Sequence, residues 1–129
     1  MKSKRGFTAL ELVFVILVFS VAVVFFFVQK ANIDAMSRDQ QSKVAINAMY
    51  YNLEEVYYPA HSYYPKTISE NNLKAMDPQL FTDPYGFNIG DKSSSLRYEP
   101  TGCDGDKCKS YTLRATLEKE DDFIKNSRH

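Results

Sequence analysis

Two cysteines, Cys103 and Cys108, have types and spacing that suit covalent or metal chemistry. They stand in Cys-Asp-Gly-Asp-Lys-Cys, and a short loop with a central Gly favours a disulfide between them. Free thiols and a metal site remain alternatives, although the only histidines, His61 and His129, have no ligand-like spacing to these cysteines. The disulfide would contribute about 2 kcal/mol in the chain-entropy model and would require an oxidising compartment outside the cytoplasm.

Glu11 is a second candidate, because it is the only charged side chain in the largely apolar run from Phe7 to Val28. A charge at the centre of a membrane helix costs about 2.5–3.5 kcal/mol, and less near the helix end. The Glu11 carboxylate therefore needs a partner, and the nearest cations in the sequence are Lys4 and Arg5.

Catalytic and metal sites are not indicated. The chain has no phosphate-binding glycine loop, no paired His ligands, and no Ser or Cys nucleophile beside a plausible base. We therefore expect no enzymatic activity and no cofactor. Two acidic clusters lack the spacing of a known calcium loop and are interpreted as solvated turns. They are Asp104/Asp106 and Glu118/Glu120/Asp121/Asp122.

Nucleic acid is not indicated as a partner either. The formal net charge is zero, so no bulk field draws the chain to a polyanion. The tyrosines between Tyr50 and Tyr64 would form a stacking platform for DNA only with flanking basic residues, and only His61 and Lys66 are near in sequence. Packing of a helix end against a sheet explains these tyrosines.

The element that must position Glu11 is an N-terminal helix. As a helix the run 7–28 is about 33 Å long, against about 30 Å of bilayer hydrocarbon, so it can span a membrane. Residues 1–6 form a basic leader, with Lys2, Lys4 and Arg5, which we expect on the cytoplasmic side. A secretory signal peptide fits less well, because the run is long and no small-residue cleavage site follows it.

Beyond the apolar run, residues 29–58 read as an amphipathic continuation of the same helix, without Gly or Pro. The stretch Asp34–Lys43 is polar nearly all round, so we expect it to be exposed or covered only by neighbouring subunits. Pro59 should end the helix, since the residue before a proline avoids helical geometry.

Residues 59–129 predict a small globular head. A capping box at Thr67–Glu70 predicts a short helix to about Met76. Strands are predicted at Ser95–Glu99 and Tyr111–Leu117, the second from its alternation of apolar and polar residues, with both cysteines in the hairpin loop Thr101–Lys109. The polar tail Lys119–His129 is expected to be frayed. The predicted fold class is α+β, with one long helix packed on a small antiparallel sheet.

The N-terminal segment Lys-Ser-Lys-Arg-Gly-Phe-Thr-Ala-Leu-Glu, ending at Glu11 and followed by an apolar helix, resembles the N-terminus of type IV prepilins and of type II secretion pseudopilins. The resemblance implies cleavage between Gly6 and Phe7 by a membrane-embedded prepilin peptidase, N-methylation of Phe7, and assembly through pairing of the Phe7 amine with Glu11 of another subunit. The turn Thr82–Gly86 is similar to the Asp-Pro-Trp-Gly stretch of major pseudopilins, with Tyr85 in place of Trp.

The implied function is that of a structural subunit of a type IV pilus-like filament. Its partners would be copies of itself, the prepilin peptidase, the membrane, and an assembly platform with its ATPase. It would be a single-pass inner-membrane precursor first, and an extracellular or periplasmic filament once assembled. The alternatives are a minor pilin, a pseudopilin, or a membrane-anchored adhesion domain that never polymerises. Many type IV pilins have Gly and Pro at positions matching Ser20 and Val28. This chain has neither, so we expect a continuous helix from about Phe7 to Tyr57 in the filament.

Overall fold

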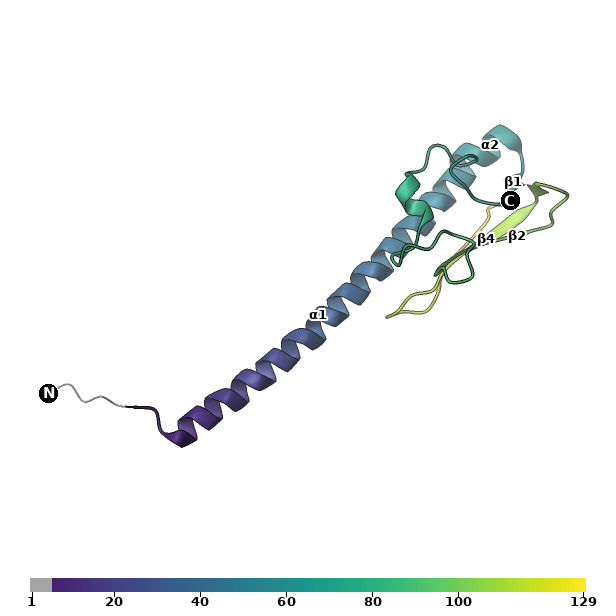
Figure 1. The fold of residues 1–129 in the computed structure, drawn as a ribbon. Helices are drawn as coiled ribbons and strands as arrows, with labels where there is room; N and C mark the ends of the chain where they lie inside the picture. Colours follow the sequence, from purple (N-terminus) through teal and green to yellow (C-terminus); the bar gives the residue numbers. More distant parts are fainter. Residues whose placement is uncertain (1–5) are drawn as a thin grey trace. The chain divides into compact units, whose positions relative to one another are not determined.

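The computed structural model describes residues 6–129, which form two compact units that divide between Asp34 and Ala35 (Figure 1). The leader residues Lys2, Lys4 and Arg5 lie outside the described residues. The long helix α1 covers Ala9–Tyr51 and supplies residues to both units. It is α-helical throughout Ser20–Lys30, in agreement with the continuous helix that the sequence predicts for the single chain.

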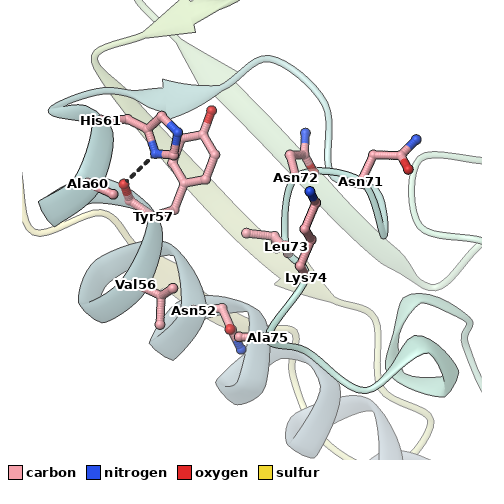
Figure 2. A pocket seen from close by; sticks show the side chains of 10 residues that line it. All are labelled: Asn52, Val56, Tyr57, Ala60, His61, Asn71, Asn72, Leu73, Lys74 and Ala75. Carbon is pink, nitrogen blue, oxygen red and sulfur yellow. Dashed lines mark hydrogen bonds between the residues drawn. The ribbon is translucent and has the colours of Figure 1, made fainter.

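The helix does not end before Pro59, and that prediction was wrong. A π-helix, η1, follows at Asn52–Tyr57, and a last turn, α2, covers Tyr58–His61 with Pro59 in its first positions. The Tyr58 amide donates to Leu53 O, five residues back. A proline ring normally clashes with the carbonyl four residues earlier, and the wider π turn relieves that clash. Figure 2 shows the resulting helix end, where His61 lies against Tyr57.

The second unit has an antiparallel sheet in the order β2-β4-β5, formed by Leu96–Thr101, Ser110–Ala115 and Phe123–Asn126. The β2–β4 register runs from Leu96 opposite Ala115 to Thr101 opposite Ser110, which confirms the predicted hairpin. A two-stranded sheet pairs β1, Tyr64–Pro65, with β3, Lys107–Cys108. The α+β layout is therefore as the sequence predicts.

The core of this unit lies between the helix and the three-stranded sheet. The alternation in β4 buries Tyr111, Leu113 and Ala115, while the helix contributes one face of buried side chains to the same cluster. The helical members are Ala45, Ile46, Met49, Leu53 and Tyr57.

Two predictions for the head are corrected. Residues 67–76 form turns and no helix, because Asn72 accepts from Ser69 N at 2.8 Å and donates to Thr67 O at 2.6 Å. Such side-chain bonds to the local backbone favour turns over helix. The short helix is instead the 3-10 turn η2, Pro78–Phe81, capped by Asp77. The tail is not frayed, since β5 pairs with β4.

The stretch Asp34–Lys43 is also not exposed all round, contrary to expectation. Asp39 is buried and accepts from the backbone amides of Glu118 (2.8 Å) and Lys119 (2.9 Å). Beside it, Arg38 pairs with the Glu118 carboxylate at 2.8 Å. Hydrogen bonds from these backbone amides offset the cost of burying the Asp39 carboxylate. The amides are distant in sequence, so the periodicity of residues 34–43 does not predict this burial.

Candidate functional site

The start of α1 holds the residues on which the sequence prediction depends. The Glu11 Oε2 atom accepts from Thr8 N at 3.0 Å and from Thr8 Oγ1 at 3.2 Å, while Glu11 N donates to Thr8 Oγ1 at 3.2 Å. This reciprocal arrangement is a capping box, which satisfies backbone donors at the helix N-terminus. The Glu11 charge also lies near the positive end of the helix dipole.

Glu11 therefore has a partner within its own chain, Thr8. The sequence prediction considered only the cations Lys4 and Arg5 as nearby partners. The spacing Thr-x-x-Glu before an apolar run is a known helix-start signal and would have predicted it. Both hydrogen bonds from Thr8 go to Oε2, and within residues 6–129 no hydrogen bond to Oε1 is found. One carboxylate oxygen is thus available to a further donor.

The junction between Gly6 and Phe7 precedes this capping box and is accessible. Phe7 is 82% exposed, and a Cβ added at Gly6 would meet no atom within 4 Å. Neither residue belongs to a helix or strand. The peptide bond between them is therefore open to a protease, and substitution at Gly6 would not disturb packing.

The apolar side chains that follow are not packed inside the unit. The large hydrophobic residues from Phe7 to Val28 are exposed by between 38% and 82%. This is the one stretch of the described chain that is long and apolar enough to cross a membrane, a test that a secretory signal sequence also passes. An apolar surface of this extent marks an interaction with lipid or protein.

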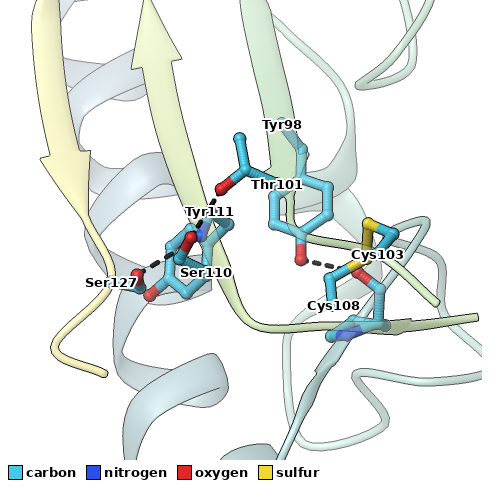
Figure 3. Close-up of a disulfide and its surroundings, with 8 residues drawn as sticks. Tyr98, Thr101, Cys103, Cys108, Ser110, Tyr111 and Ser127 are labelled. Carbon is cyan, nitrogen blue, oxygen red and sulfur yellow. Dashed lines mark hydrogen bonds between the residues drawn. A yellow bond between two sulfur atoms is a disulfide. The ribbon is translucent and has the colours of Figure 1, made fainter.

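The predicted disulfide between Cys103 and Cys108 is present (Figure 3). Cys108 is buried in β3, opposite Tyr64, whereas Cys103 lies in the exposed part of the loop. Both cysteines are used by this bond, so the free-thiol and cysteine–metal alternatives do not apply. No cluster of three potential metal-ligating side chains occurs among residues 6–129.

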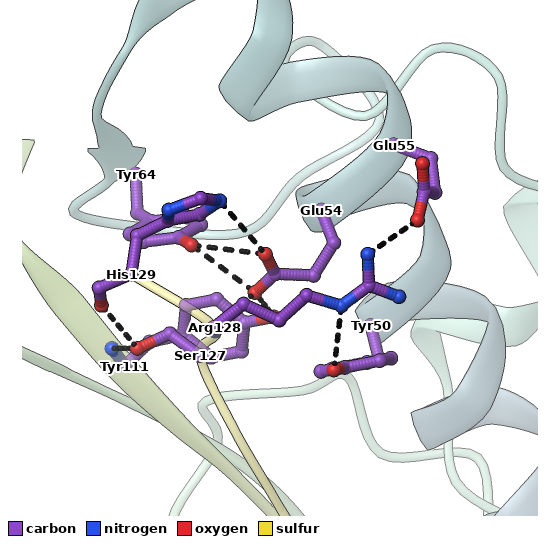
Figure 4. Close-up of polar contacts among 8 residues, drawn as sticks. All are labelled: Tyr50, Glu54, Glu55, Tyr64, Tyr111, Ser127, Arg128 and His129. Carbon is purple, nitrogen blue, oxygen red and sulfur yellow. Dashed lines mark hydrogen bonds and ion pairs between the residues drawn. The ribbon is translucent and has the colours of Figure 1, made fainter.

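A buried carboxylate in the head, Glu54, was missed by the sequence analysis. It is 4% exposed and accepts from Tyr111 Oη at 2.7 Å, Tyr64 Oη at 3.1 Å and Arg128 N at 3.1 Å (Figure 4). Burial raises the pKa of both tyrosines, and the hydrogen bonds to Glu54 raise it further. Glu54 stands eight residues after Ile46, on the same helical face, and this spacing could have predicted its burial.

The predicted turn at residues 83–86 also contains a buried carboxylate. Asp83 is 5% exposed and accepts from the amides of Tyr85, Phe87 and Ser95 at 2.9–3.0 Å. The Tyr85 hydroxyl donates to Glu118 at 2.8 Å. The pKa of Glu118 is lowered by its hydrogen bonds to Arg38 and Tyr85. The turn is thereby tied to the residues that bind Asp39.

The structure brings Thr8 to Glu11 and leaves Gly6 and Phe7 accessible beside them. The described chain has a capped helix start, an apolar run long enough to cross a membrane, and a disulfide in the head. No protein-family model, curated protein or solved structure matches this chain.

Proposed function

We propose that this chain is a structural subunit of a type IV pilus-like filament, made as a membrane-bound precursor and cleaved between Gly6 and Phe7. The observation that carries the proposal is the position of Glu11. It is the only charge in the apolar run, and it lies in the first turn of α1 directly after an accessible Gly6–Phe7 junction.

Cleavage at this junction creates an amine on Phe7, one residue before the capping Thr8. In a stack of helices shifted along their axes, the amine of one copy reaches Glu11 of another. Glu11 can then keep Thr8 on Oε2 and accept the neighbour's amine on Oε1, which accepts no hydrogen bond within residues 6–129. Charge-assisted hydrogen bonds are roughly twice as strong as neutral ones, so this pairing adds to the cap.

Polymerisation also gives the exposed apolar run a partner. Lipid covers these side chains in the precursor, and copies of the same helix cover them in the filament. Contacts of this head-to-tail kind produce an open helical polymer when their rotation does not close into a ring. A peptidase, a platform protein and an ATPase would process and assemble the subunits, as the prepilin-like N-terminus implies.

The disulfide supports export of the head. Disulfides persist in oxidising compartments and are rare in the cytoplasm. With the basic leader inside, the apolar run crosses the membrane once and the head with its Cys103–Cys108 bond lies outside.

The test is to express the full chain with a prepilin peptidase and determine the N-terminus of the product by mass spectrometry. We expect mature protein that begins at Phe7 with a methylated amine, and surface fibres that contain it. Gly6→Ala should be cleaved much less, and since the added Cβ meets no atom, misfolding cannot explain that result. Assembled protein that retains Met1 would rule out the processing step.

A membrane-anchored adhesion domain is the second candidate, and the capping box is the observation that favours it. Because Thr8 already donates two hydrogen bonds to the Glu11 carboxylate, a single helix can stabilise this charge without a second copy of the chain. In that case the protein would stay in the membrane fraction at full length, and electron microscopy would find no fibres.

A further inference from the structure

The two cysteines of the Cys103–Cys108 disulfide lie in different surroundings (Figure 3). Cys108 is 1% exposed and belongs to the core cluster that also contains Tyr64 and Tyr111. Cys103 is exposed and belongs to no strand. A reagent from solvent can therefore contact Cys103, whereas the core shields Cys108.

The burial of Cys108 comes from strand pairing. In the β1–β3 pair Cys108 lies opposite Tyr64, which is itself fully buried and donates its hydroxyl to Glu54 at 3.1 Å. The next residue of β1, Pro65, accepts a hydrogen bond on its carbonyl oxygen from Tyr98 Oη at 2.6 Å. The strand that covers Cys108 is thus held both by the helix and by β2.

Backbone hydrogen bonds hold the loop between the cysteines. Asp104 N donates to Lys107 O at 2.7 Å, and Lys107 N donates to Asp104 O at 3.2 Å. Lys109 N donates to Thr101 O at 3.2 Å, where the loop joins the hairpin. These contacts involve no sulfur atom. We therefore expect the reduced head to keep the same loop, with one cysteine at the surface and the other in the core.

Access decides which cysteine can begin a thiol–disulfide exchange. A disulfide forms when a thiolate attacks a sulfur of another disulfide and passes through a mixed disulfide, and the rate depends on access to the reacting sulfur. In the folded, reduced head an external disulfide can meet the thiolate of Cys103. Cys108 can meet only a sulfur that is already inside the loop, which is the sulfur of Cys103.

We infer that Cys103 is the entry point for exchange with an external disulfide donor of the thiol–disulfide oxidoreductase class, and that Cys108 is the resolving cysteine. In the first step the Cys103 thiolate attacks one sulfur of the donor's disulfide and releases the other as a thiolate. In the second step Cys108 loses its proton to water and attacks the Cys103 sulfur, which releases the donor's remaining thiolate. The chain loses two electrons and two protons, and the donor becomes a dithiol.

The same asymmetry governs the reverse reaction. An external thiolate reaches the Cys103 sulfur, so the Cys108 thiolate is the leaving group. The loop keeps Cys108 beside the mixed disulfide, and a reaction within one molecule is faster than the same reaction between two. Cys108 therefore attacks again and closes the bond. This chemistry rests on the loop alone and does not depend on the proposal that the helix polymerises.

The experiment uses the full chain in detergent, reduced and then freed of reductant. The probe is bis(2-hydroxyethyl) disulfide, which carries no charge, so the exposed carboxylates of Asp104 and Asp106 do not repel it. Samples are quenched with acid, and the adducts are mapped by mass spectrometry of peptides. Wild-type protein should show a transient adduct on Cys103 and then the closed disulfide. Cys108→Ser should accumulate that adduct, and Cys103→Ser should react about tenfold more slowly or less.

The two variants are matched controls for each other, because each lacks the disulfide and keeps one thiol. In guanidinium chloride their rates should agree within about threefold, since the unfolded chain no longer buries Cys108. An oxidised Cys-x-x-Cys oxidoreductase is the protein probe. It should be trapped as a mixed disulfide by folded Cys108→Ser and not by folded Cys103→Ser.

Thermal unfolding of both variants checks that the head is folded, and the site of the wild-type adduct decides the question if a variant is not. The inference is overturned if the wild-type adduct forms on Cys108. It is also overturned if folded Cys103→Ser reacts as fast as folded Cys108→Ser, or if the difference in rate persists in guanidinium chloride.

Discussion

The Tyr111 hydroxyl donates a 2.7 Å hydrogen bond to Glu54 Oε1, and so joins the central strand β4 to the π-helical end of the long helix. Both side chains are buried. Tyr64 and the Arg128 amide donate to the same carboxylate. One side chain of the helix thus binds three separate segments of the head.

Glu54→Ala should destabilise the full chain by about 3 kcal/mol, because it leaves two buried tyrosine hydroxyls and the part-buried Arg128 amide unpaired. Glu54→Gln keeps an acceptor oxygen and should cost less, about 1–2 kcal/mol. Glu55→Ala is the matched control: it removes only the half-exposed ion pair with Arg128 and should cost below about 1 kcal/mol. Guanidinium unfolding in detergent, followed by near-ultraviolet circular dichroism, measures these values. Equal losses for Glu54→Ala and Glu55→Ala would contradict the central role of Glu54.

Stability should fall as the pH rises above about 10. The folded chain raises the pKa of Tyr64 and Tyr111, so above the unfolded value of about 10 the unfolded chain loses protons that the folded chain keeps. Each tyrosine then contributes a slope of about −1.4 kcal/mol per pH unit. Unfolding free energies measured between about pH 9 and 11 should decline less steeply in Tyr111→Phe. Tyr51→Phe, which removes an exposed hydroxyl, should keep the wild-type slope.

Local patterns predict this fold where neighbours in sequence decide the structure. The alternation from Tyr111 to Leu117 correctly predicts a strand with one buried face, since that pattern matches the pleat of a sheet. The burial of Asp39 could not be predicted, because its donors, at Glu118 and Lys119, are about 80 residues away. The prediction that the helix ends before Pro59 was wrong for a related reason. The expectation that proline ends a helix assumes α-helical turns before it, and the chain forms a π turn there.

For the candidate site, the sequence predicts the residues but not all of their contacts. Gly6, Phe7 and Glu11 were singled out by type and spacing, and the structure leaves them accessible at the start of the helix. The contact between Glu11 and Thr8 was not predicted, because only charged partners were considered for the Glu11 carboxylate. The donor is the neutral Thr8, three residues earlier in the chain.

Substitution of Glu11 should separate its capping role from its role in assembly. Gln at this position can still form a capping box, so Glu11→Gln keeps the cap and removes the charge, whereas Glu11→Ala removes both. Both variants should insert into the membrane at least as well as wild type, since each removes a charge from the apolar run. If the charge pairs with the Phe7 amine of another copy, both variants should fail to form fibres.

Fibre yield by electron microscopy and amide hydrogen exchange near Thr8 are the two measurements. Exchange should be faster in Glu11→Ala and close to wild type in Glu11→Gln, as expected for loss of a cap worth about 1 kcal/mol. Normal fibres from Glu11→Gln, together with failure of Glu11→Ala, would mean that capping and not charge supports assembly.

Reaction of single cysteine variants should reveal the unequal burial of the two sulfurs. Wild-type protein without reductant should not react with a thiol reagent, because both sulfurs are bonded. Cys108→Ser leaves Cys103 in an exposed loop, so it should label quickly, whereas Cys103→Ser leaves the 1%-exposed Cys108, which should label slowly. Each variant should lose about 2 kcal/mol of stability. Rapid labelling of wild-type protein would contradict the disulfide.

The helix should stay continuous through Ser20–Lys30 when subunits assemble. Gly costs about 1 kcal/mol and Pro about 3 kcal/mol in a helix interior, and this chain has Ser20 and Val28 where many pilins have those residues. The Ser20 hydroxyl donates to Ile16 O at 2.7 Å, so it bonds within the helix and leaves the ladder intact. An apolar filament core also penalises every unpaired backbone group, as lipid does.

A cryo-electron microscopy map of the filament at side-chain resolution tests this prediction. Wild-type subunits should show unbroken helix from Ala9 through Lys30. The double variant Ser20→Gly with Val28→Pro is the matched comparison. It introduces both helix-breaking residues, so it should lose helical hydrogen bonds in this region. An extended stretch between Ser20 and Lys30 in the wild-type filament would mean that subunit packing outweighs the local preference of the chain for helix.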